Sequence, residues 1–262
     1  MTIGLAVLAA GLRICEFVFA YEPGTELMTA LHPASIAVAS VSALAIALLF
    51  LFRGRSVPEA APSSGPLWLV VEFLACLSLT GSALFDAQRA LERGTVSLLV
   101  FAALTLLALI VLLLCGRNFS DGKKNFTRGF YLTIPVFWGC YWLILDFWDH
   151  AANPMLLSYL YNMAAIIFLT LALHSAAGIS FGRAKAHVTR LLAFCAVFFS
   201  LTTLGSTQLA GLFLSPGTTF SAMTLTPALL CRHIFVVLHM SFVGLRAAGN
   251  TSLTEDSPAT PL

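Results

Sequence analysis

The sequence predicts an all-α protein, a polytopic transmembrane helix bundle with about eight spans. Apolar residues make up 59% of the 262-residue chain and charged residues only 10%, whereas soluble domains average about 45–50% and about 25%. Apolar stretches of about 20 residues, the length that crosses a bilayer, recur from end to end. So few charges cannot cover a soluble surface, and we therefore expect a multi-pass protein of the cell membrane, with the lipid bilayer as its main partner.

Eight stretches are long and apolar enough to be spans, at residues 3–20, 34–52, 67–86, 95–116, 129–148, 155–178, 190–213 and 221–246. The first is the weakest because it is short and contains Arg13 and Glu16; if it does not cross, seven helices remain. We predict one helical domain over residues 1–246. The polar, proline-containing segment 247–262 is expected to be a disordered cytoplasmic tail.

The basic residues predict the orientation. Ten of the fourteen Lys and Arg residues lie in one set of alternate gaps between the spans, and only Arg89 and Arg93 lie in the other set. Because Lys and Arg favour cytoplasmic loops, both termini are expected in the cytoplasm. No basic cluster is dense enough for a nucleic-acid patch, so nucleic acid is excluded as a partner.

Charged residues inside spans are costly and are therefore the leading site candidates. Arg13 and Glu16 share one helix face, and Arg232 lies near the middle of the eighth predicted span. If the first and last helices meet, Glu16 bridges the two arginines and one positive charge remains, which favours a small anionic ligand. The alternative is an ion pair that only fixes helix register.

A second polar layer is expected nearer the cytoplasm. It comprises Glu72 in the third span, His174 in the sixth and His239 in the eighth. If these helices are neighbours, the layer can relay protons, or bind a metal or haem. Isolated hydrogen bonds between helices are the third alternative.

The eighth span carries a repeated polar stripe. Leu225, Arg232, His239 and Arg246 are spaced by seven residues and share one face, which we expect to point into the bundle. His233 is one position off this stripe and is expected to line the same cavity.

Two further patterns receive structural interpretations. Asp146, Asp149 and His150 at the end of the fifth span resemble a solvated helix end, with cation binding as the alternative. In the second span, small residues at every fourth position, Ser35, Ala39, Ala43 and Ala47, favour close packing against a neighbouring helix.

No loop is long enough for a soluble catalytic domain, and no P-loop, HExxH or GxSxG motif occurs. The leading prediction is therefore a small-molecule transporter or ligand sensor, without a resident cofactor. Arg232, His239, Arg13 and Glu16 would bind its ligand, and Glu72, His174 and His233 would couple protons. Arg232→Ala should then abolish the ligand response and leave the folded yield intact. The alternatives are an intramembrane enzyme that uses the His/Glu layer, and an accessory subunit that binds a partner membrane subunit or forms a homo-oligomer.

Overall fold

A computed structural model of the chain describes residues 2–20, 32–51, 66–116, 126–151, 156–213 and 226–249. Every regular element within these ranges is an α-helix. The eight helices are α1 (Thr2–Phe19), α2 (Pro33–Leu51), α3 (Pro66–Arg93), α4 (Val96–Gly116), α5 (Phe126–His150), α6 (Leu156–Ser180), α7 (Ala186–Phe213) and α8 (Pro227–Gly249). The predicted tail from residue 250 onward lies outside the described residues.

All eight helices are long and apolar enough to cross a membrane, and α1 is among them. The prediction of an all-α, eight-span bundle is therefore confirmed at the level of helix number, length and composition. Two boundaries differ from the prediction and matter for the site. Helix α3 continues through Arg93 to a turn at Gly94, whose φ is 64°, and α8 begins at Pro227 rather than near residue 221.

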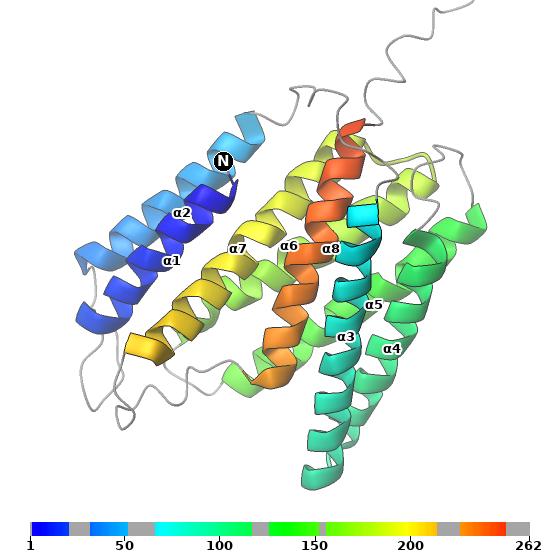
Figure 1. The fold of residues 1–262 in the computed structure, drawn as a ribbon, viewed down its shortest axis with the longest axis horizontal. Coiled ribbons are helices and arrows are strands. Elements are labelled where there is room, and N and C mark those ends of the chain that lie inside the picture. The colour runs from blue at the N-terminus through cyan, green and yellow to red at the C-terminus, as the bar shows by residue number, and fades with distance from the viewer. Residues whose placement is uncertain are drawn as a thin grey trace, which may run out of the picture.

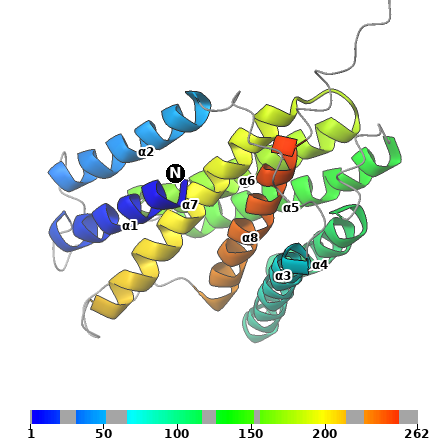
Figure 2. The same ribbon diagram turned by 45° about the horizontal axis from the view of Figure 1, so that its top comes forward.

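Six of the helices close into a ring (Figures 1 and 2). Helices α3, α4, α5, α6, α7 and α8 each pack against the next, and α8 returns to pack against α3. The hairpin of α1 and α2 lies outside this ring, with α1 against the outer side of α7. Helix α7 thus stands between α1 and α8, so the first and last helices are not direct neighbours in the way that a shared Glu16 bridge requires.

Aromatic and aliphatic side chains fill the ring. Trp138 of α5 is fully buried at its centre, stacks on Phe101, and donates its indole N–H to Thr105 Oγ1 at 2.9 Å. The indole of Trp142 lies 5.6 Å from that of Trp138, centroid to centroid. The Trp138 N–H is thus paired inside the apolar core, and polar groups gather at one end of the bundle.

The small-residue stripe of α2 is not used as predicted. Helix α2 buries Val38, Ser42, Ala45 and Leu49, whereas Ala39, Ala43 and Ala47 are exposed on the outside of the bundle. Two faces of this helix are apolar enough to pack, so its sequence pattern did not identify the face that contacts α1 and α7. The prediction that this stripe packs on a neighbouring helix is wrong for these three alanines within the described chain.

Candidate functional site

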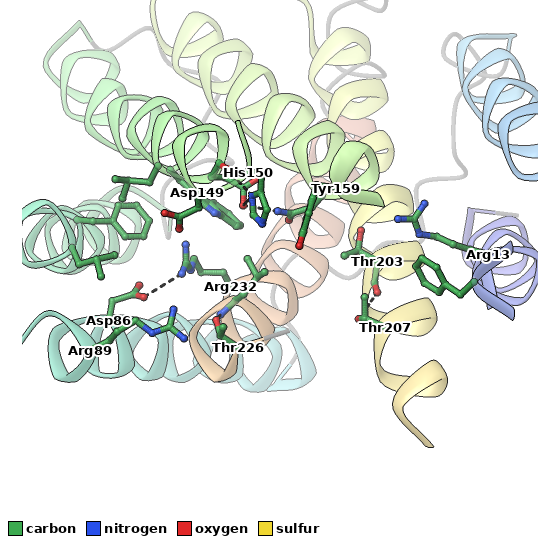
Figure 3. A pocket seen from close by; sticks show the side chains of 18 residues that line it. Arg13, Asp86, Arg89, Asp149, His150, Tyr159, Thr203, Thr207, Thr226 and Arg232 are labelled. Atoms are coloured by element: carbon green, nitrogen blue, oxygen red, sulfur yellow. Dashed lines mark hydrogen bonds and ion pairs between the residues drawn. The ribbon is translucent and has the colours of Figure 1, made fainter. Parts of the chain in front are cut away.

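A polar pocket of about 180 Å³ lies at the end of the bundle where α3, α5 and α7 finish and α4, α6 and α8 begin. Side chains from every helix except α2 line it (Figure 3). Three arginines, Arg13, Arg89 and Arg232, line it together with Asp86, Asp146 and Asp149. Charges of both signs thus meet in a cavity inside an apolar bundle, where charge is costly unless it is paired or hydrated.

Arg232 is held in the pocket by an ion pair, a backbone hydrogen bond and two ring contacts. It is 7% exposed, and its Nη2 lies 3.2 Å from Asp86 Oδ1, an aspartate that is itself 1% exposed. Its Nε donates to the carbonyl of Ala228 at 3.3 Å. Its guanidinium carbon lies 4.9 Å from the ring centroids of both Phe101 and Trp142. Ion pairing and ring contacts therefore hold this charge at a fixed point between α3, α4, α5 and α8.

Asp86, not Glu16, is the partner of Arg232. Glu16 lies 3.7 Å from Arg13 within α1, as its i, i+3 spacing predicts, and Arg13 also covers the Tyr161 ring at 4.1 Å. The expected bridge from Glu16 to both arginines is wrong, because α7 separates α1 from α8. The structure does bring Arg13 and Arg232 into the lining of one pocket.

The pocket does not carry the excess positive charge from which the anionic ligand was predicted. Its lining contains three arginines and three aspartates, and Asp146 lies within electrostatic range of Arg232. The premise of two arginines for one carboxylate is therefore wrong. Arg232 also lies about 8 Å from the start of α8, closer to the helix end than the predicted middle of the span.

His233 does not line the pocket that contains Arg232, so that expectation is wrong, but it belongs to a buried hydrogen-bond chain that reaches this pocket. Asn162 Nδ2 donates to Asp146 Oδ1 at 2.8 Å, and Asn162 Oδ1 lies 2.8 Å from His233 Nε2. Since Asn162 Oδ1 only accepts, His233 Nε2 carries the proton. In the neutral imidazole its Nδ1 then accepts from Ser200, whose Oγ is 3.3 Å away. All three bonds of the chain from Ser200 to Asp146 then point toward the Asp146 carboxylate.

Asp146 is not part of a solvated helix end. It is 7% exposed and lines the pocket, and its Oδ2 is buried without a hydrogen-bond partner among the described residues. Asp149, one turn away, is exposed as predicted. His150 Nδ1 donates to the Asp146 carbonyl at 2.7 Å. The interpretation of this cluster as a solvated end is thus wrong for Asp146, because α6 and α8 contact the inner face of α5, through Asn162 and through the rings of His233 and Phe235.

The second predicted layer is only partly assembled. His239 is 3% exposed and its Nδ1 lies 3.1 Å from Glu72 Oε1, which joins α8 to α3. His174 is exposed on the outside of α6, away from this pair. No group of three or more His, Cys, Asp or Glu side chains that could hold a metal occurs within the described residues. The three-membered layer on which the metal or haem alternative depends is therefore not formed.

The polar stripe of α8 faces the bundle at the two positions whose side chains the structure describes. Arg232 and His239 are both buried, as predicted, and each pairs with a carboxylate of α3. Leu225 and the side chain of Arg246 lie outside the described part of the chain. His239 does not line the pocket that contains Arg232, so these two candidate ligand-binding residues belong to separate sites.

Comparison with known proteins adds no relative. The chain matches no protein-family model, no curated protein and no solved structure. The case for a function thus depends on the geometry of the pocket.

Sequence reasoning missed Asp86, Arg89 and Asn162 as site residues. The predicted third span ended at residue 86, which placed Asp86 at a helix end and Arg89 in a loop. A charge-balance argument would have recovered Asp86, because a buried arginine such as Arg232 requires a carboxylate at the same depth. Asn162 carried no comparable signal, since a single amide in an apolar helix has many structural uses.

Proposed function

We propose that this protein binds a small polar molecule in the pocket beside Arg232 and serves as a membrane transporter or ligand sensor. The observation that carries this proposal is the pocket itself, a cavity of about 180 Å³ lined by six charged side chains inside a membrane bundle. Four of the six are buried, namely Arg13, Asp86, Asp146 and Arg232, and burying charge is costly. Contact with a ligand would explain why the protein retains these charges, whereas packing alone would not.

The distribution of basic residues supports placing both termini in the cytoplasm of a cell bounded by this membrane. The pocket then opens on the outer side, because it lies where α1, α3, α5 and α7 end. The Glu72–His239 pair lies closer to the opposite end. In this proposal, the outer pocket binds the ligand and the inner pair couples a proton to it.

Two other functions have weaker support. An intramembrane enzyme built on the His/Glu layer needs His174 beside His239, and the two are apart. An accessory subunit would use its buried charges only for packing. The Arg13–Glu16 and Arg232–Asp86 pairs suit that role, but the polar pocket between them does not.

Native mass spectrometry on gently extracted protein tests the proposal. We expect the wild type to retain a small polar molecule. Arg89→Gln should lose it, because this side chain lines the pocket, whereas Arg93→Gln on an exposed part of α3 should keep it. Equal retention by both variants would place the molecule elsewhere. A wild type that stays bare, with no thermal stabilisation by any small polar probe, would favour the accessory subunit.

A further inference from the structure

We infer that the ligand of this pocket is zwitterionic, with a cationic amine held by Asp146 and Asp149 and an anionic group held by Arg89. The inference rests on the proposed function, since it specifies the chemical class of molecule that the same pocket binds. It replaces the purely anionic ligand that the sequence predicted.

The first support is the unused hydrogen-bonding capacity around the pocket, which has both signs. On α5, Asp146 Oδ2 is buried without a hydrogen-bond partner and Asp149 makes no hydrogen bond among the described residues. On α3, Arg89 lines the pocket half-buried and donates no hydrogen bond within the same part of the chain. A buried carboxylate without a full set of donors costs free energy, and an ammonium group in the pocket beside Asp146 and Asp149 would offset their negative charge.

The second support is the placement of these groups. Arg232 lies between them in Figure 3, with Asp149 and His150 on one side and Asp86 and Arg89 on the other. Arg232 is already bonded to Asp86 and to the Ala228 carbonyl. Arg13 lies in an ion pair with Glu16. Among the described residues, Arg89 is therefore the lining guanidinium that donates no hydrogen bond, and the carboxylates of α5 lie across from it as acceptors.

The third support is that groups of both signs line the pocket outside its two arginine–carboxylate pairs. Arg232 is paired with Asp86 and Arg13 with Glu16, which leaves, among the described residues, Arg89 of α3 and the two aspartates of α5 to meet a ligand. In a low-dielectric bundle, a bare anion or cation would leave the groups of one sign uncompensated. A zwitterion meets both, because each of its poles lies against a group of opposite sign. An apolar cavity of about 150 Å³ holds benzene, so a pocket of about 180 Å³ accepts a molecule the size of a small amino acid.

Thermal unfolding of the purified full-length protein in detergent, with size-matched probes, tests the inference. The probes are ω-amino acids from glycine to ε-aminocaproate, which vary the separation of ammonium and carboxylate. Each is compared with the carboxylic acid, the amine and the alcohol of the same chain length. A ligand that binds only the folded state raises the unfolding midpoint in proportion to its occupancy. We expect one ω-amino acid to bind at least about tenfold more tightly than its three analogues.

Substitutions then assign the poles. Asp146→Asn keeps the acceptor for Asn162. It should weaken binding of the ω-amino acid by about tenfold or more without changing the affinity for the carboxylic acid. Arg89→Gln should weaken binding of the ω-amino acid and of the carboxylic acid. Asp149→Asn, on an exposed side chain, gives a second test of the amine pole if Asp146→Asn folds poorly. Arg93→Gln, exposed on the same helix as Arg89, should change nothing.

The outcomes separate the inference from the proposed function. If a carboxylic acid, amine or alcohol binds as tightly as every ω-amino acid, the pocket binds ligands but the zwitterion is refuted. If the ω-amino acid binds best and neither aspartate substitution weakens it, the assigned amine pole is refuted. If no probe of any class shifts the midpoint, both the inference and the proposed function fail.

Discussion

Replacement of Arg232 by Met tests the central ion pair of the site. Asp86 is 1% exposed, and without Arg232 its nearest remaining hydrogen-bond partner is Ser82 Oγ at 3.5 Å. Removing one partner of a buried pair typically costs about 3–5 kcal/mol, because the other charge stays buried and unpaired. Arg89 lies one turn away on α3 and screens part of that charge. We therefore expect Arg232→Met to lower the free energy of unfolding by about 3 kcal/mol.

A double-mutant cycle isolates the pair. Asp86→Asn together with Arg232→Met removes both charges, and Met still fills the space between Phe101 and Trp142. The double variant should recover most of the loss, with a coupling free energy of about 2–3 kcal/mol. Unfolding in mixed micelles with increasing SDS, followed by circular dichroism, measures these values. Arg93→Met, on the exposed end of α3, is the matched control.

Two results would refute this reasoning. A loss below about 1 kcal/mol for Arg232→Met would mean that Asp86 is neutral or hydrated without its partner. Strict additivity in the cycle would mean that the two side chains do not interact. The sequence-based expectation that substitution of Arg232 leaves the folded yield intact is replaced by this prediction, because the structure gives Arg232 a buried carboxylate to compensate.

Two matched pairs of substitutions test helix packing. Gly205→Ala should destabilise the protein by about 1–3 kcal/mol, because the new Cβ would come 2.8 Å from Ala10 Cβ where α7 meets α1. At Gly11, a new Cβ would meet nothing within 4 Å. Gly11→Ala should therefore leave unfolding in SDS unchanged or slightly raise the stability. Ala45→Leu, at 1% exposure, should overpack the contact of α2 with the bundle and cost about 1–3 kcal/mol, whereas Ala43→Leu on the exposed stripe should cost less than about 0.5 kcal/mol. Equal losses for Ala43 and Ala45 would mean that α2 presents a different face to its neighbours.

Composition and apolar length were enough to predict the helices, because the bilayer imposes one length and one secondary structure on every span. They also indicated that Arg13 and Arg232 are buried, since charge at membrane depth must avoid lipid. Which helices are neighbours could not be predicted. That Glu16 stays with Arg13 while Asp86 pairs with Arg232 depends on α7 lying between α1 and α8, and hydropathy carries no signal for it.

Helix ends limited the prediction of the site. A span predicted from hydropathy ends at the first charged residues. The predicted third span therefore ends at residue 86, although the helix continues to Arg93. Asp86 and Arg89 were thereby assigned to a boundary and a loop. The same effect made Asp146 look solvated, because its distance along the helix is visible in the sequence and its burial against α6 and α8 is not.

The 146 residues that separate Asp86 from Arg232 have a consequence for biogenesis. At a synthesis rate of about 5–20 residues per second, α3 emerges from the ribosome roughly 7–30 s before the residue that neutralises its carboxylate. Arg13 has its carboxylate partner almost as soon as it is made, since Glu16 follows it within one turn. During that interval Asp86 has only local partners on α3, among them Arg89 one turn away. Until α8 is made, α3 is therefore an incompletely paired polar helix, and closure of the ring by α8 completes its ion pair.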